Sequence, residues 1–338
     1  MTERLATAGD VPLVLTIRGG LPENVHRGRI CVVSADNRKI VEAYGDADAA
    51  AFIRSAGKPL QAIGPLLGGV AEAYDWEDRH LAMLAASHRG FPAQVEALDE
   101  MRKKAGIPEE AFAFRAGAPI NAKSRDEWAR DGESPRKLYH TCAGKHLGML
   151  AWSKLSGWPL EGYTRIDHPA QKQVVRHIRS WTNTDENDSA FGRDGCGLPA
   201  AAVPLRSIAL AYARLACLDT APAAASTEAA GRVAQAMNRH PELVEGQGRL
   251  ASLLLADPNI VAKSGAQGLF AIGLRRERLG IAIHVSDGSE MPWALIAIAL
   301  LKRLGGVSAQ TMASLEARYP SEYVNDTGDV AGHKETLF

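Results

Sequence analysis

Strand-like runs at both ends of the chain, with helical patterns between them, constrain the fold most. β-Branched and other apolar residues are concentrated in residues 11–20, 28–46, 260–274 and 280–288. The turn-forming residues ADNR at 35–38 separate two such runs and predict a β-hairpin. The middle of the chain instead repeats its apolar residues at helical spacing.

This distribution predicts an α/β (α+β) fold. We expect an antiparallel sheet assembled from both ends of the chain, flanked by helices, with a helical lobe inserted into it. We place the α/β lobe at about residues 1–54 and 259–338 and the helical lobe at about 55–258. Together they form one bipartite catalytic unit that spans the chain.

The composition excludes several classes of partner. Lys plus Arg and Asp plus Glu both total 39, so the net charge gives no sign of nucleic acid or an acidic partner. No apolar run reaches the ~18 residues of a membrane span. The first residues, MTERLATAGDVP, lack a basic stretch followed by an apolar one, so we expect no export signal and a cytoplasmic location. The four cysteines form no C-x-x-C pair, which favours thiols or metal ligands over a disulfide framework.

A serine and a lysine precede a proline in RSAGKP. Pro59 lacks a backbone donor and therefore fits the first turn of a helix, which places Ser55 near its N-cap and Lys58 in its first turn. Most such serines only cap the helix. A lysine here, however, opposes the helix dipole, so the local field favours its neutral amine. A neutral lysine one turn from a serine is a general base beside a nucleophile.

A second lysine motif lies near the C-terminus. Residues 263–265 read Lys-Ser-Gly on a predicted strand, and Lys263 alone would be taken for a lysine that protects a sheet edge. Serine β-lactamases and penicillin-binding proteins combine an S-x-x-K helix start with such a motif, in this order. We find no clear S-D-N element, and a cytoplasmic chain would meet no cell-wall substrate. Acyl transfer is therefore favoured over β-lactam chemistry.

Three further clusters extend this pattern: SHRG at 87–90, CAGKH at 142–146 and DGCGLP at 194–199. Together with RSAGKP and AKSGAQG, they resemble the L-asparaginase II family, the Rhizobium-type or class 3 L-asparaginases. The resemblance extends from the N-terminal strand to the NDTGDVAG tail. It implies a fold similar to serine β-lactamases and glutaminases, and an amidohydrolase that converts L-asparagine to L-aspartate and ammonia.

The resemblance also implies the catalytic residues. Ser55 becomes the nucleophile with Lys58 as its base, and Ser87 pairs with Lys263 as a second Ser–Lys tandem. Two neighbouring lysines repel each other as ammonium groups, so we expect at least one to be neutral near pH 7. Arg54 is a candidate for binding the substrate carboxylate.

A zinc site and a homodimer follow from the resemblance alone. The implied ligands are Cys142, Lys145 and Cys196, with water completing the shell. His146, a more conventional ligand than a lysine, and Asp194 are candidates for substrate binding. The roles of His88 and Arg89 stay open, with a hydrogen-bonded structural role favoured, and we assign Cys31 and Cys217 to the core.

Two other functions stay open. The same scaffold serves other serine amidohydrolases, such as a glutaminase or a β-lactamase-like esterase. A non-catalytic relative that uses zinc structurally belongs to a different class, and the presence of both Ser–Lys pairs argues against it.

Overall fold

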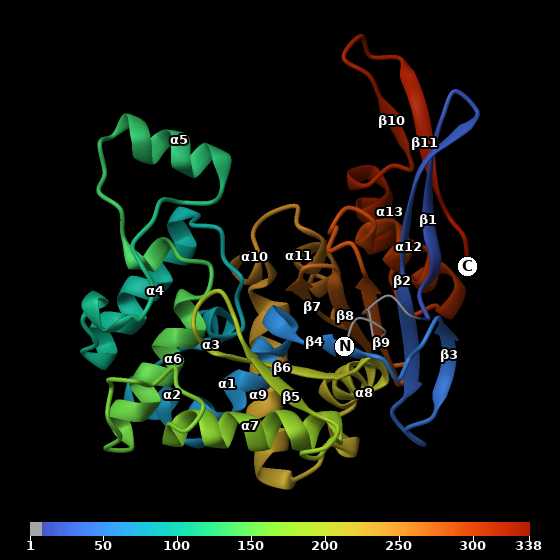
Figure 1. The fold of residues 1–338 in the computed structure, drawn as a ribbon. Helices are drawn as coiled ribbons and strands as arrows, with labels where there is room; N and C mark the ends of the chain where they lie inside the picture. Colours follow the sequence, from blue (N-terminus) through green and yellow to red (C-terminus); the bar gives the residue numbers. More distant parts are fainter. Residues whose placement is uncertain (1–8) are drawn as a thin grey trace. The chain divides into compact units, whose positions relative to one another are not determined.

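The chain is described by a computed structural model that covers residues 9–338 (Figure 1). Residues 1–8, which belong to the stretch in which we expected no export signal, lie outside the described residues. The chain divides into two compact units. The sheet unit comprises the chain up to Ala56 together with Ala202–Thr220 and Asp257–Phe338, and the helical unit comprises Gly57–Ala201 and Ala221–Ala256.

The sheet unit is built around an eight-stranded sheet. Seven strands follow the order β10-β11-β1-β2-β9-β8-β7, and β3 pairs with β2. The strands are β1 (Val11–Arg18), β2 (Leu21–Ser34), β3 (Ile40–Tyr44), β7 (Ile260–Ala266), β8 (Leu269–Leu274), β9 (Leu279–Val285), β10 (Glu322–Val324) and β11 (Val330–Thr336). Strands from the two chain ends meet where β2 pairs with β9 and where β1 pairs with β11. The predicted assembly of one antiparallel sheet from both ends of the chain is confirmed.

The predicted hairpin at residues 35–38 is present. β2 and β3 pair antiparallel across the turn at 35–39, with Ile30 opposite Tyr44. The run at 260–274 divides into β7 and β8, because residues 267–268 adopt left-handed backbone angles that end the first strand. β10 and β11 form a further hairpin, which Figure 1 shows beside β1. We did not predict that hairpin, since its strands are short and polar.

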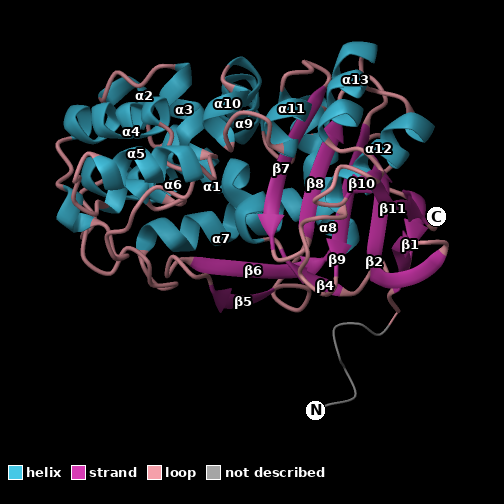
Figure 2. Ribbon diagram, turned by 90° about the horizontal axis from the view of Figure 1, so that it is seen from above, coloured by secondary structure: helices cyan, strands magenta, loops and turns pink. Residues whose placement is uncertain are grey.

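Helices cover both faces of this sheet (Figure 2). Every residue of β8 is buried, which requires cover on each side. Helix α8 (Leu205–Ala216) approaches so closely at Gly273 that a Cβ there would lie 2.3 Å from the Tyr212 carbonyl oxygen. On the alternate face Phe270 packs against Trp293 of α12 (Trp293–Leu304). The expected α/β class, with an antiparallel sheet flanked by helices, is confirmed.

Smaller elements complete the sheet unit. Strand β4 pairs with the end of β6, which leads through Pro204 directly into α8. Residues 202–204, which lie within the predicted helical lobe, thus belong to a strand, and the helix begins at Leu205. The remaining elements here are β4 (Ala50–Phe52), β6 (Pro199–Pro204, which begins in the helical unit), η4 (Leu218–Thr220) and α13 (Ala309–Arg318).

The helical unit is inserted between strands of the sheet unit and contains short strand β5 besides its helices. Its elements are α1 (Lys58–Leu67), α2 (Val70–Ala73), α3 (Asp78–Leu84), α4 (Pro92–Ala105), η2 (Glu109–Ala111), α5 (Ala122–Arg130), η3 (Lys137–Tyr139), α6 (Ala143–Leu155), α7 (Pro169–Thr182), β5 (Ala190–Arg193), α9 (Ala224–Arg239), α10 (Pro241–Val244) and α11 (Leu250–Leu255). Among the helices of residues 9–338, none combines the length and hydropathy needed to cross a membrane.

The two units differ from the sequence-based lobes in one segment. The lobe predicted at about 55–258 includes residues 202–220, whereas the structure groups these residues with the sheet. The reason is packing: α8 contributes an alanine-rich surface, with Ala209 and Ala213, that lies directly on Gly280 of β9.

Candidate active site

Ser55 and Lys58 lie where the chain changes from strand to helix. Residues Arg54–Gly57 form a 3₁₀ turn, η1, and α1 begins with Lys58 and Pro59. Gly57, not Ser55, is the N-cap, and no side chain caps this helix. Arg54 has a φ of 43°, which is costly for a residue with a Cβ. The half-buried Ser55 therefore follows a strained residue and lies in the turn before Lys58.

The Lys58 side chain is fully buried in the helical unit. Its Nζ donates to the Ala86 carbonyl at 2.6 Å and to the Thr141 carbonyl at 3.2 Å. It also lies 3.0 Å from the Ser87 Oγ. A neutral amine satisfies this arrangement by giving two N–H bonds to the carbonyls and accepting the serine O–H with its lone pair. The resemblance paired Lys58 with Ser55, and the structure adds a hydrogen bond from Lys58 to Ser87.

Backbone contacts position Ser87 and its neighbour His88. The Ser87 N–H donates to the Val244 carbonyl at 2.7 Å. Both His88 ring nitrogens are satisfied, with Nε2 2.7 Å from the His140 carbonyl and Nδ1 accepting from the Gly90 N–H at 3.2 Å. Burial lowers the pKa of His88 to about 4. His88 is thus a neutral histidine that holds two loops together, as expected of a structural residue.

Lys263 lies on β7 in the sheet unit and is fully buried. Its Nζ donates to the next residue, Ser264, at 3.0 Å to the Oγ and 3.1 Å to the carbonyl oxygen. Sequence reasoning gave Ser264 no role, although the Lys-Ser-Gly motif contains it.

The thiols of Cys142 and Cys196 meet in the helical unit. Cys142 is the N-cap of α6, and Cys196 lies in the turn between β5 and β6. The two side chains are hydrogen-bonded, and this bond lowers the pKa of Cys142 while it raises that of Cys196. Burial opposes ionisation of both, whereas Lys58 and Lys145, in their charged forms, lower the pKa of Cys142. Cys142 is therefore the thiol of the pair that loses its proton more readily.

Lys145, in the first turn of α6, joins these thiols. Burial by itself would lower its pKa, but Cys142, Cys196 and Asp194 together raise it. Its Nζ lies 3.7 Å from an Asp194 carboxylate oxygen, and both side chains are buried. The structure thus brings together all three residues that the resemblance implies as zinc ligands, with Asp194 beside them.

The donor set fits zinc in its chemistry. Two thiolates and a neutral amine suit this ion once they have lost their protons. Within residues 9–338, no group of three or more His, Cys, Asp and Glu side chains is arranged to hold a metal. A metal at the thiol pair therefore depends on the Lys145 amine as its third protein ligand.

His146 lies next along α6 and is wholly buried. Its Nδ1 is 2.6 Å from the Tyr163 hydroxyl, which also accepts the Ala113 N–H at 3.1 Å. Its Nε2 has no hydrogen-bond partner among the described residues. Burial and the adjacent Lys145 hold the pKa of His146 well below its usual range, so the ring is neutral. No spacing signal in the sequence points to Tyr163.

The other two cysteines behave as predicted. Cys31 on β2 and Cys217 after α8 are buried. Burial raises the pKa of Cys31 to about 12 and also raises that of Cys217. Both are core thiols.

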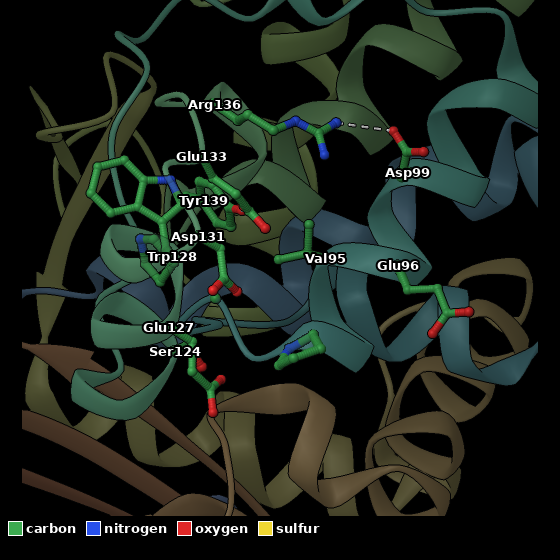
Figure 3. Close-up of a pocket in the computed structure, with 13 residues that line it drawn as sticks. Val95, Glu96, Asp99, Ser124, Glu127, Trp128, Asp131, Glu133, Arg136 and Tyr139 are labelled. Carbon is green, nitrogen blue, oxygen red and sulfur yellow. Dashed lines mark hydrogen bonds and ion pairs between the residues drawn. The ribbon is translucent and has the colours of Figure 1, made fainter.

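A cavity of about 420 Å³ in the helical unit contains none of the predicted site residues (Figure 3). It lies by α4 and α5 and is lined mainly by carboxylates and two aromatic rings, Trp128 and Tyr139. Its Arg136 is paired with Asp99 at 3.1 Å and with Glu109 at 3.0 Å. The size of a cavity therefore does not identify the reactive residues in this molecule.

An α/β fold whose buried lysine amine is bonded to a serine hydroxyl is typical of hydrolases that activate a serine. The chain belongs to the L-asparaginase II family, whose sequence profile matches residues 14–336. It is an amidohydrolase of this family, and a small molecule is the expected substrate.

Solved structures similar to the chain include a β-lactamase from Mycobacterium bovis, with 12% identity over 82% of this chain and 94% of that one, and a TM-score of 0.41. A structure of Mglu has 18% identity over 83% of this chain and 68% of that one, with a TM-score of 0.37. A β-lactamase-like protein from Bacteroides dorei has 13% identity over 76% and 85%, with a TM-score of 0.39. A search of curated proteins gave no significant match.

Proposed function

We propose that the protein is an L-asparaginase that cleaves the side-chain amide of L-asparagine through a serine activated by lysine. The observation that carries this proposal is the buried Lys58 amine. It lies 3.0 Å from the Ser87 hydroxyl and one turn after Ser55, in a chain of the L-asparaginase II family.

The proposed reaction has two acyl-transfer steps. In the first, the Ser55 oxygen bonds to the amide carbon, its proton passes to neutral Lys58, and the carbon–nitrogen bond breaks. The amide nitrogen leaves as ammonia after it takes up a proton. In the second, water attacks the β-aspartyl ester, releases L-aspartate and returns the proton to Ser55. Ser87 and Lys263 are proposed to carry protons as a second pair.

Lys58 needs a lone pair at the moment of attack. Its two N–H groups donate to two carbonyl oxygens, so the lone pair of the amine can accept a proton from a hydroxyl. The Ser87 oxygen, bonded to the same amine, offers a route for the proton away from Lys58. The arrangement supports Lys58 as the base.

Asparagine also carries a carboxylate and an ammonium group. Arg54 is the proposed partner of the carboxylate, because its planar fork matches two carboxylate oxygens. Asp194 is the proposed partner of the ammonium group, and His146 is a further proposed substrate-binding residue. The buried Nε2 of His146, which has no partner among the described residues, supports its part.

Cys142, Lys145 and Cys196 are proposed to hold zinc. When bound, the ion supplies positive charge that helps to orient the substrate. The raised pKa of Lys145 beside Cys142 and Cys196, and the 3.7 Å distance from its Nζ to the Asp194 carboxylate, support this grouping. Proton transfer in the reaction is assigned to the serines and to Lys58 and Lys263, not to these residues.

Ammonia release tests the proposal. The purified full-length protein is expected to act on L-asparagine faster than on L-glutamine or nitrocefin. Ser55→Ala should abolish turnover, since it removes the attacking oxygen. Ser252→Ala, which removes a buried hydroxyl without a hydrogen-bond partner among the described residues, serves as the control. Full activity in Ser55→Ala would refute Ser55 as the nucleophile. A preference for glutamine or nitrocefin would refute L-asparagine as the substrate.

A further inference from the structure

The contact between Lys263 and Ser264 is unusual for a strand. Successive side chains of a regular strand point to opposite faces of the sheet, so neighbours do not touch. Here the long lysine chain folds back over its own backbone, and its Nζ reaches both oxygens of the next residue, at 3.0 and 3.1 Å.

An irregular strand end makes this contact possible. β7 is the last strand in the order of the sheet, and its register with β8 shifts between Ser264 and Ala266. Ala266 and Gln267 then adopt positive φ angles of 60° and 50°. Gly265 lies in the shift, where a Cβ would come within 2.8 Å of Leu269. Such bulges re-aim side chains next to active sites.

We propose that Ser264 is a positioning residue whose hydroxyl holds the Lys263 amine in place for proton transfer. The inference rests on the proposed function, in which Lys263 carries protons. It assigns to the middle residue of the Lys-Ser-Gly motif a task that differs from contact with the substrate.

The chemistry of a hydroxyl explains why serine suits this position. A lysine that carries protons alternates between ammonium and amine. The Ser264 oxygen accepts a hydrogen bond from the ammonium, and its O–H donates to the lone pair of the amine. The neighbouring carbonyl oxygen can only accept. Ser264 therefore restrains Lys263 in both states and limits the rotamer freedom of a long, flexible side chain.

Steady-state kinetics on L-asparagine test this role in the full-length protein. Ser264→Ala should lower kcat about ten- to hundredfold, the effect of losing one hydrogen bond to a charged group, and leave KM nearly unchanged. Ser264→Thr keeps the hydroxyl and should recover most of kcat. Ser286→Ala is a matched control, since it removes a hydroxyl at another strand end of the sheet unit that has no hydrogen-bond partner among the described residues.

The outcomes separate this inference from the proposed function. Wild-type kcat in Ser264→Ala, beside an inactive Lys263→Ala, overturns the inference alone. Full activity in Lys263→Ala overturns the role of Lys263 itself. A loss in Ser264→Ala that Ser264→Thr does not restore, or that appears in KM instead of kcat, also counts against positioning. Thermal unfolding of each variant identifies any loss of activity that comes from misfolding. If Ser264→Ala does not fold, the test rests on Ser264→Thr, and a kcat for that folded variant far below the wild-type value overturns the inference.

Discussion

The helical unit holds two fully buried lysines with very different surroundings. Lys58 is hydrogen-bonded within this unit to three neutral oxygen atoms, those of two carbonyls and of one hydroxyl. Lys145 lies among the thiols of Cys142 and Cys196 and the carboxylate of Asp194. The same side chain at the same depth thus has neutral hydrogen-bond acceptors around Lys58 and anionic neighbours around Lys145, although Lys58 also lies near enough to Cys142 to affect the pKa of that thiol.

This difference is the one we expect between the proposed base, Lys58, and the proposed zinc ligand, Lys145. Anionic partners stabilise the ammonium form, and for Lys145 they outweigh burial and raise its pKa. Neutral oxygens do not stabilise the ammonium form in this way. One of the oxygens around Lys58 belongs to a hydroxyl, which can give up a proton. Burial alone therefore does not determine which protonation form of a lysine is stabilised, because the charge of its partners also contributes.

Replacing Lys58 should have the largest effect. Lys58→Met keeps the length of the side chain but removes the amine, so kcat on L-asparagine should fall about a thousandfold or more, as for other lost general bases. Lys145→Met is the matched comparison and should keep more activity. Ammonia release at saturating substrate measures both. Equal activities for the two variants would mean that the distinction between the lysines is wrong.

Replacing Lys145 should instead weaken zinc binding. Lys145→Met removes the proposed third protein ligand, and affinity for zinc should fall about a hundredfold. Competition with a chromophoric chelator measures the affinity, independently of turnover. Lys58→Met should bind zinc like the wild type. A Lys145→Met protein with unchanged zinc affinity would remove this lysine from the ligand set.

His88 sharpens the comparison through pH. Its pKa is about 4 in the folded protein against an ordinary 6.5, because burial disfavours the charged ring. The stability that comes from keeping it neutral is complete above about pH 6.5 and is lost as the pH falls toward about 4. Between about pH 7 and 4.5, the wild type should lose about 2.5 kcal/mol more than His88→Gln. Urea unfolding at both pH values measures this, and parallel losses in the two proteins would contradict it.

Local sequence patterns predicted the parts of the fold that depend on neighbouring residues. Pro59 indicated where α1 begins, and the turn at 35–38 indicated the β2–β3 hairpin. The place of α8 on the sheet was not predicted, because it depends on close packing against Gly273 and Gly280 from a distant part of the chain. Hydrophobic periodicity shows that a helix has an apolar face, but not which layer that face covers.

The candidate site shows the same limit. The motifs indicated which residue types carry the chemistry, and the resemblance added the two thiols and Lys145. The hydrogen bond from Lys58 to Ser87 joins residues far apart in sequence, and the bond from Tyr163 to His146 gives no sequence signal. Only the fold shows that Lys58 is bonded to neutral oxygens and Lys145 to anions.

Trapping the acyl-enzyme tests the central claim most directly. The wild-type protein is mixed with L-asparagine, quenched in acid within the first turnover, digested and analysed by mass spectrometry. We predict the added mass of one aspartyl group on the peptide that contains Ser55, and its absence in Lys58→Met. An aspartyl group on Ser87 instead, or turnover that releases ammonia with no trapped ester on either serine, would contradict the account.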